Sequence, residues 1–370
     1  KALYGGVDSG KLWNDTFDSF ISSQGFVRNE VDVCVYNGSD NFGNQITVVV
    51  YVDDILATCI NRDAIEDLFE KIRTRFDGIV YKIGDKFSYL GITVQMERDR
   101  GAVRLTMEHY VEELLKDTGT CRGSPTPATS DMREIDEKSE PLEKKKVEVF
   151  HSTVARLLYL AKKIRHDLLV SVTFLATRVK SPSEQDQRKL ARVLRYVFQT
   201  KHLGLTLEGD GRNITHDIDV SFAVHKDMKS HTGDTLSLGK GAIHSGSTKQ
   251  SLVTKSSAEG ELVGLSDAAN EALWTRQFLI SQGIPQVSII IHQDNQSTID
   301  MIHTGRHTSG RSRHIQVRHY WLYDNITTSM PFPLTVKYKP TSEMTADVLT
   351  KPLQGEQFRK LRNKLLNCDT

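Results

Sequence analysis

The chain has 370 residues, of which 38% are hydrophobic and 26% charged, which is enough for two or three globular domains with sizeable cores. Its net charge of +1 excludes a globally basic nucleic-acid-binding surface, so any such surface must be local. No apolar run approaches the roughly 20 residues needed to span a bilayer. The four cysteines form no Cys-x-x-Cys pair, which argues against a structural zinc site and favours a reducing compartment.

The first half of the chain is organised around residues 46–59, where two apolar runs flank Asp53 and Asp54. Two short runs joined by a two-residue break predict a β-hairpin. A hairpin turn ordinarily takes Asn-Gly or Asp-Gly, because both central residues need positive φ. Two carboxylates at this break depart from local rules, as functional sites do. We interpret Asp53 and Asp54 as ligands of a divalent metal; the alternative is a pair of solvated turn aspartates.

Amphipathic helices flank this hairpin. Apolar residues recur at helical spacing over residues 11–26 and 65–76. Short strands are predicted at 89–94 and 103–106, and a helix is predicted over 107–118. Elements in this order favour an α+β fold with helices on one face of an antiparallel sheet.

The pattern changes after residue 118. Glycines, prolines and dense charges predict a linker over residues 119–147. Apolar residues at helical spacing then predict a strongly helical segment over 148–203.

Asp219 and Glu261 stand out in the last third of the chain. Asp219 lies on a predicted strand, on the opposite face to its apolar neighbours Ile218 and Val220. Residues 256–259 form a capping box that opens a helix extending to about residue 283. Glu261 lies on the apolar face of this helix. An ionised carboxylate is costly there unless it is paired or bound to a metal.

Asp294 and Asp347 complete a set of four carboxylates. Asp294 follows an apolar strand at 287–292, so it lies at the carboxyl end of a strand, where α/β sheets place their ligands. A helix rich in basic and aromatic residues and a strand at 334–338 follow, and Asp347 opens a short helix. Strands, helix, strand, helices, strand and helix in this order resemble the layout of the RNase H fold.

A cluster of carboxylates suits phosphodiester hydrolysis, which needs an activated water and a stabilised leaving oxygen. Two Mg²⁺ ions about 3.5–4 Å apart can provide both, and Mg²⁺ prefers oxygen ligands. Without metal, two charges about 4 Å apart repel by roughly 4 kcal/mol at an effective dielectric constant of 20. We therefore predict a site for two Mg²⁺ ions, with Mn²⁺ as a substitute, rather than unrelated surface acids.

Motifs in the first half resemble the reverse transcriptase of copia-type retrotransposons. Tyr51-Val-Asp-Asp54 resembles the catalytic turn, residues 1–5 with 11–13 resemble the primer-template segment upstream of it, and Phe87–Ile92 resembles the hairpin that grips the primer. The resemblance implies that Asp53 and Asp54 are catalytic. It also implies primer-template contacts by Tyr51, Tyr89, Leu90 and Gly91.

Motifs at 256–262, 293–297 and 346–352 resemble the nuclease domain of the same elements. The resemblance implies a catalytic, metal-binding tetrad of Asp219, Glu261, Asp294 and Asp347. It also implies a loop histidine, His307, that helps the product to leave. Phosphate contacts with a steep salt dependence are expected from a set of nearby arginines, namely Arg306, Arg311, Arg313 and Arg318. RNA in a hybrid would be recognised through its 2′-hydroxyls and helical shape.

The resemblance covers nearly the whole chain and implies a fold class with three parts: an α+β partial reverse transcriptase palm/thumb, a helical connection and an α/β RNase H-like domain. The boundaries that it implies are a partial palm with primer grip at 1–118, a linker at 119–147, a helical thumb/connection at 148–205, an RNase H-like domain at 206–353 and a tail at 354–370.

The implied function is two-metal hydrolysis of RNA in RNA–DNA hybrids, by the C-terminal part of a Pol polyprotein. RNA-directed DNA polymerase activity, with dNTP as substrate, is expected only in a longer parent, because the first catalytic aspartate and the fingers precede this chain. Expected partners are RNA–DNA hybrid, primer-template and the remainder of Gag-Pol, in cytoplasmic virus-like particles or the nucleus and without a membrane. One alternative is a non-catalytic remnant that only binds primer-template. Another is a transposase or integrase that shares the RNase H fold, but the hairpin at Tyr51–Asp54 and the connection argue against it.

Overall fold

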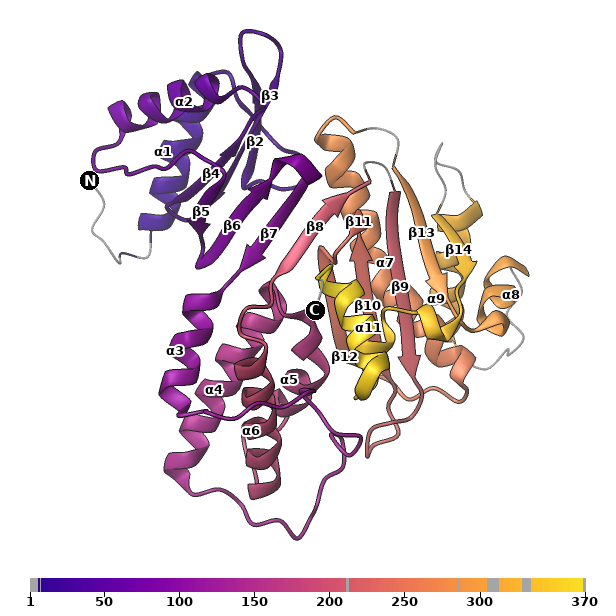
Figure 1. Cartoon of the computed structure of the whole chain (residues 1–370). Helices are drawn as coiled ribbons and strands as arrows, with labels where there is room; N and C mark the ends of the chain where they lie inside the picture. Colours follow the sequence, from indigo (N-terminus) through magenta and orange to yellow (C-terminus); the bar gives the residue numbers. More distant parts are fainter. Residues whose placement is uncertain are drawn as a thin grey trace. The chain divides into compact units, whose positions relative to one another are not determined.

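The computed structural model describes residues 6, 8–210, 213–284, 287–304, 313–327 and 334–368 (Figure 1). The chain forms two compact units, one of residues 1–94 with 277–285 and the other of residues 95–276 with 286–370. Residues 277–285, which belong to the first unit, therefore interrupt the sequence of the second unit.

The first unit contains an antiparallel sheet in the order β1-β2-β3-β4, with helices packed on one face. Ile46, Val48 and Val50 of β3 are buried, whereas the residues between them are only partly buried, so one face of the sheet forms the core. Phe17 of α1 and Ile72 of α2 pack in the same cluster. The elements are α1 (Ser9–Ser23), β1 (Val27–Arg28), β2 (Val35–Ser39), β3 (Gln45–Tyr51), β4 (Asp54–Thr58), α2 (Arg62–Arg75), β5 (Lys86–Tyr89) and β6 (Ile92–Glu97), of which β6 continues into the second unit.

Both predicted helices of this unit are confirmed, but the single strand predicted over 89–94 is wrong. Leu90 and Gly91 have φ of 50° and 75°, and they form a turn between β5 and β6. Two consecutive positive φ values are the geometry of a tight hairpin turn. The pattern of apolar residues did not reveal this break because leucine rarely adopts positive φ.

The second unit contains a five-stranded sheet in the order β12-β10-β9-β13-β14. β10 is antiparallel to both β9 and β12, whereas β13 is parallel to β9 and β14. This mixed sheet, with helices between its parallel strands, is the predicted RNase H-like layout. The elements are β9 (Asn213–Ser221), β10 (His231–Ser237), β11 (Gly239–Lys240), β12 (His244–Lys249), α7 (Ser257–Ser281), β13 (Ser288–Gln293), α8 (Gln296–Thr304), α9 (Arg313–Thr327), β14 (Leu334–Tyr338), η3 (Thr341–Glu343), α10 (Asp347–Thr350) and α11 (Gly355–Leu366).

Glycines let α7 and α10 approach opposite faces of this sheet closely. A Cβ on Gly264 of α7 would lie 2.6 Å from Val220 Cγ2. A Cβ on Gly233 of β10 would lie 2.6 Å from Thr350 Cγ2 on the other face. Both distances are shorter than side chains tolerate, so each glycine sets the spacing between helix and sheet. The predicted fold class, α+β in the first unit and α/β RNase H-like here, is confirmed.

The helical segment packs directly on this sheet. The nearly uniformly apolar helix α5 contacts α4, α6, α10 and strand β12. β7 pairs antiparallel with β8, which also pairs with β11. The elements are η1 (Arg98–Arg100), β7 (Ala102–Thr106), α3 (Glu108–Thr118), α4 (Lys144–Lys163), η2 (His166–Leu168), α5 (Leu169–Ala176), α6 (Glu184–Gln199) and β8 (Leu205–Gly209).

Residues 123–142, which we call the strap, lie within the predicted linker and have an irregular backbone. They nevertheless pack on the second unit. Ser124, Thr126, Ala128 and Met132 are buried. Gln354 Nε2 donates to the Ala128 carbonyl oxygen at 2.8 Å. The strap is therefore part of the folded unit.

A buried ion pair joins the helices at η2. Arg165 Nη2 lies 2.8 Å from Asp167 Oδ2, and both side chains are almost fully buried. Tyr196 Oη donates to the same oxygen at 2.7 Å, and Arg165 Nη1 donates to the Thr200 carbonyl oxygen at 3.0 Å. Burial alone would raise the pKa of Asp167, but Arg165 and Tyr196 outweigh it and lower that pKa.

We expect Asp167→Ala to lower the free energy of unfolding by about 3–5 kcal/mol, because it leaves Arg165 buried without its counter-ion. Urea unfolding followed by circular dichroism would measure this loss. The control is Glu66→Ala, which removes the exposed pair with Arg62 and should cost less than about 1 kcal/mol. Equal losses in the two variants would contradict the prediction.

His166 makes the stability of the second unit depend on pH. Its side chain is buried, with Nδ1 3.1 Å from Ser245 Oγ. Burial lowers the pKa of His166 to about 4, whereas an unfolded histidine titrates near 6.5. The unfolded chain therefore binds more protons between these values, so stability should fall as pH decreases from about 6.5 to about 4.

We expect His166→Gln to flatten this decline by up to about 3 kcal/mol, which corresponds to the shift of the pKa. Urea midpoints measured across this pH range would show the change. His151, whose side chain is exposed, gives the matched control His151→Gln, which should keep the wild-type slope. An unaltered slope in His166→Gln would contradict the assignment.

Candidate metal centre

Asp219 comes from the central strand of the second unit. It lies near the end of β9, is 2% exposed, and faces the α10 side of the sheet. Thr350 Oγ1 donates a hydrogen bond to Asp219 Oδ2. The alternation of β9 places this carboxylate on the opposite face to Ile218 and Val220, as predicted, and the structure shows that α10 lies on that side.

Glu261 comes from the second turn of α7. Ser256 Oγ accepts from the Glu259 amide at 3.2 Å, so the predicted capping serine is in place. The reciprocal bond of Glu259 goes to the Lys255 amide, one residue earlier than in a standard capping box. Glu261 lies one turn before Gly264 on the face that meets the sheet, and it is 5% exposed.

Asp294 directly follows β13, at the strand's carboxyl end. Its Oδ2 accepts a hydrogen bond from Thr341 Oγ1 at 2.6 Å. Buried Gln293 fixes the neighbourhood, because its side chain donates to Glu261 Oε2 at 3.1 Å and accepts from the Asp294 amide at 2.8 Å.

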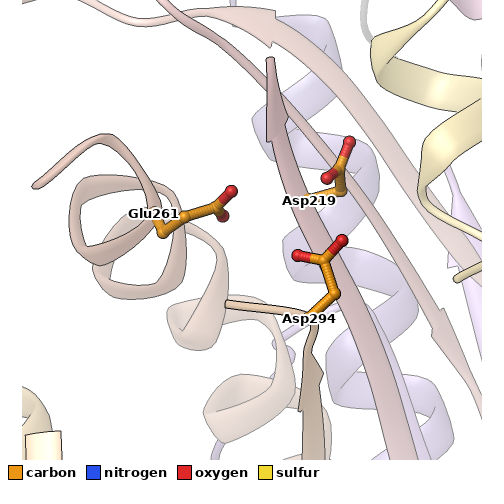
Figure 2. A group of neighbouring side chains, drawn as sticks. All are labelled: Asp219, Glu261 and Asp294. Atoms are coloured by element: carbon orange, nitrogen blue, oxygen red, sulfur yellow. The ribbon is translucent and has the colours of Figure 1, made fainter. Parts of the chain in front are cut away.

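Figure 2 shows the three carboxylates pointing toward a common space from β9, α7 and the end of β13. One carboxylate oxygen from each of Asp219, Glu261 and Asp294 lies within 4.8 Å of the others. Burial and the charge of Asp219 raise the pKa of Glu261, although Gln293 partly opposes this. An all-oxygen donor set with this excess of negative charge fits a divalent cation such as Mg²⁺.

Asp347 lies beside Asp219 but outside this group of three. It is 1% exposed at the start of α10, and its Oδ1 is 2.6 Å from Lys351 Nζ. The same ammonium group is 3.4 Å from Asp219 Oδ2. Burial and the charge of Asp219 raise the pKa of Asp347 to about 6. The structure thus places the fourth predicted ligand next to the first, with Lys351 bridging them.

The supporting residues around the centre were not predicted. Thr350 and Lys351 contact Asp219 directly. Arg133 of the strap donates to the Thr350 carbonyl oxygen at 2.6 Å, and burial lowers the pKa of Arg133 to about 10. Lys351 lies four residues after Asp347, a spacing that could have indicated a helical ion pair. No local sequence pattern indicates the hydrogen bond between Arg133 of the strap and Thr350.

The other predicted carboxylates lie in the first unit. Tyr51 pairs with Asp54, so the hairpin turn consists of Val52 and Asp53 rather than of Asp53 and Asp54. Val52 has a φ of 57°, which is a strained conformation for a β-branched residue and is typical of functional turns. Trp13 Nε1 donates to the Val52 carbonyl oxygen at 2.6 Å. Asp53 and Asp54 are exposed.

Tyr89 ends β5, and Leu90 and Gly91 follow it in the turn between β5 and β6; their implied primer-template contacts stay predictions. Burial and the charge of Asp54 raise the pKa of Tyr89. Within the described residues, its hydroxyl is buried without a hydrogen-bond partner. Tyr51 is 60% exposed.

The predicted basic residues are only partly described. Arg306, His307 and Arg311 lie outside the described residues, and Arg313 opens α9. Arg318 forms an ion pair with Asp267 of α7. Among the described residues, no helix combines the length and the apolar character that a membrane crossing requires.

Comparisons with known proteins give a family match to the first part of the chain and relatives that match nearly all of it. Residues 1–130 match the family described as reverse transcriptase (RNA-dependent DNA polymerase). The retrovirus-related Pol polyprotein from transposon TNT 1-94 of Nicotiana tabacum is 28% identical over 367 residues, which are 97% of this chain and 27% of that relative. This chain is similar to copia-type retrotransposon Pol polyproteins over nearly its whole length. The TyH3 Gag-Pol polyprotein of Saccharomyces cerevisiae is 26% identical, with 99% of this chain and 22% of the relative covered.

The chain thus spans roughly a quarter of the length of these Pol relatives. Among solved structures, an RNase H1 isolated from compost has a TM-score of 0.28 and 12% identity, covering 38% of this chain and 92% of that one. The foamy viral protease-reverse transcriptase in complex with dsDNA has a TM-score of 0.48 and 11% identity, covering 92% and 60%. The fold assignment rests on the strand order above.

We expect Mg²⁺ to stabilise the second unit, by about 2.7 kcal/mol at a concentration one hundredfold above its Kd. Glu261→Gln should raise the stability of the metal-free chain, because it removes one of the repelling charges, and should diminish the response to Mg²⁺. Thermal unfolding with and without Mg²⁺ would measure both effects. The control Asp300→Asn alters an exposed acid of α8 and should keep the full response. A full response in Glu261→Gln would contradict the site.

Proposed function

We propose that the RNase H-like part, residues 206–353, hydrolyses the RNA strand of RNA–DNA hybrids. The observation that supports this proposal is the close group of buried Asp219, buried Glu261 and partly buried Asp294, with buried Asp347 beside it. These four residues would hold two Mg²⁺ ions, with Mn²⁺ as a substitute. The ions supply an activated water and stabilise the leaving oxygen when they are bound.

The remaining residues of the centre orient these ligands. Gln293 restrains both Glu261 and the backbone at Asp294, and Thr350 restrains Asp219. Each ligand also comes from a helix or a strand end and not from a long loop, which favours fixed positions for the metals. Substrate phosphates would be contacted by Arg313 and Arg318 of α9 and by Arg306 and Arg311, which precede α9 in sequence, and His307 would help the product to leave.

We also propose a role in reverse transcription within a longer parent protein. Asp53 and Asp54 would bind metal there together with an aspartate from a preceding segment, and dNTP would be the substrate. Tyr51, Tyr89, Leu90 and Gly91 would contact the primer-template. The strained turn at Val52 supports this proposal, because strain is retained where a backbone position serves function.

The proposed division of labour follows the predicted boundaries of a partial palm at 1–118, a connection at 148–205 and a tail at 354–370. The segment predicted as a linker, 119–147, would instead support the nuclease through the strap, which packs in the second unit. The protein would act as part of a Pol polyprotein, in virus-like particles of the cytoplasm or in the nucleus. Its partners would be RNA–DNA hybrid and primer-template.

We expect Mg²⁺-dependent cleavage of the RNA strand in an end-labelled RNA–DNA hybrid, and its loss in Asp294→Asn, which removes a metal ligand but keeps the size of the side chain. Gel analysis of the cleavage products would measure both. Asp300→Asn alters an exposed acid of α8 six residues further along, and this variant should cleave like the wild type.

The second candidate function is that of a non-catalytic remnant that only binds primer-template nucleic acid. A folded wild-type chain that binds the hybrid, measured by fluorescence anisotropy, but does not cleave it would support this alternative and overturn the nuclease proposal. The burial of the acidic group favours the nuclease, because a decayed site would be free to lose such costly charges.

A further inference from the structure

Lys351 is placed between two of the carboxylates that form the candidate metal centre. Its Nζ lies 2.6 Å from Asp347 Oδ1 and 3.4 Å from Asp219 Oδ2. Both carboxylates are almost fully buried, whereas the lysine side chain is 37% exposed. The ammonium group of Lys351 thus lies between the carboxylates of Asp219 and Asp347.

A second lysine in the same unit shows what a purely structural pair looks like. Lys339 Nζ lies 2.6 Å from Asp217 Oδ2, and this lysine is only 15% exposed. Asp217 is also bound by His292 Nδ1 at 2.8 Å and by the Thr345 amide at 3.0 Å. Its charge is fully compensated by protein groups. Asp347 differs from Asp217 in this respect. Among its described contacts, Lys351 is the cationic group within hydrogen-bond distance, and no histidine accompanies it.

The position of Lys351 in the chain allows it to move. It follows the last residue of the one-turn helix α10, with an extended backbone. Its ammonium group sits on a flexible four-carbon stem and reaches the centre from a partly exposed position. Withdrawal of the side chain into solvent therefore requires rotation about side-chain bonds and no rearrangement of the sheet.

We propose that Lys351 is a built-in counter-cation: it neutralises Asp219 and Asp347 in the metal-free chain and is displaced when a divalent cation binds between them. This inference rests on the metal centre of the proposed function. The closest contact of Lys351 is with Asp347, which is not one of the three carboxylates Asp219, Glu261 and Asp294. The first divalent cation therefore binds between these three. The position between Asp219 and Asp347 fills second and more weakly, because the incoming cation must replace Lys351.

The first test compares Mn²⁺ binding to the full chain without nucleic acid, with free Mn²⁺ counted by electron paramagnetic resonance at constant pH. Lys351→Met keeps an unbranched apolar stem of the same length but removes the ammonium group and its charge. We expect the weaker Mn²⁺ affinity to increase at least about tenfold and the tighter one to change by less than about threefold. Lys351→Arg, which retains a positive charge, should keep the weaker site weak.

Lys339→Met is the matched control, because it also leaves a buried carboxylate without its lysine. It should destabilise the chain, as measured by thermal unfolding, and leave both Mn²⁺ affinities unchanged. Unchanged affinities in Lys351→Met, or equal gains in both lysine variants, would overturn the role of Lys351.

A second measurement uses the wild-type chain and so does not depend on a variant that folds. Acetylation of amines by acetic anhydride, quantified by mass spectrometry, reports whether Lys351 Nζ is free. Saturating Mg²⁺ should increase the labelling of Lys351 several-fold and leave that of Lys339 unchanged. Equal labelling of Lys351 with and without Mg²⁺ would overturn displacement.

The outcomes separate this inference from the proposed function. Hybrid cleavage that is lost in Asp294→Asn, together with unchanged Mn²⁺ affinities in Lys351→Met, would overturn the counter-cation and leave the nuclease standing. Absence of Mn²⁺ binding in both the wild type and Lys351→Met would overturn both.

Discussion

Buried carboxylates need compensating positive charge, and this constraint separates the acids of the second unit into two kinds. Asp217 and Asp219 are neighbours on the same face of β9 and are buried to a similar extent. Burial alone would raise the pKa of Asp217, but His292 and Lys339 hold that pKa well below its usual range. Asp217 is therefore a structural acid whose charge the fold satisfies.

Asp219 belongs to the other kind. It shares its surroundings with Glu261, Asp294 and Asp347, and its charge contributes to raising the pKa of both Glu261 and Asp347. Repulsion of this type persists in a folded protein only where another constraint maintains it. Elements of the sheet and α7 hold these side chains together through their own packing, so the fold maintains the excess of negative charge that a divalent cation would relieve.

Local sequence patterns were enough to identify the acidic residues of the metal centre, but not the residues that surround and support them. Asp219, Glu261 and Asp294 were predictable because strand alternation, helix periodicity and strand ends are local properties. The break at Val52 was misplaced by one residue, because a β-branched residue at positive φ contradicts the local preference on which such predictions depend. The metal-binding and substrate-binding roles assigned to the site residues remain predictions in both units, and Arg306, His307 and Arg311 lie outside the described range.

Contacts of the strap lie beyond local patterns for a different reason. Its glycines, prolines and charges are typical of a linker, and they do lead to an irregular backbone. Buried Thr126 contacts residues far away in sequence, because its Oγ1 donates to Gln354 Oε1 and accepts from Arg192 Nη2. The composition of such a segment predicts that its backbone is irregular, but it does not predict which part of the protein the segment packs against.

These long-range contacts make the helical segment and the strap part of the nuclease unit. Arg133 of the strap holds the Thr350 carbonyl oxygen, and the hydroxyl of the same threonine holds Asp219. The Arg165–Asp167 pair joins η2 to α6, and α5 contacts both α10 and β12. The metal centre is thus supported on its α10 side by residues that precede the RNase H-like sheet in sequence. A fragment that began at residue 206 would retain all four carboxylates and the hydrogen bond from Ser221 to the Thr350 carbonyl oxygen, but it would lose Arg133 and so one of the two groups that hold Thr350 beside Asp219.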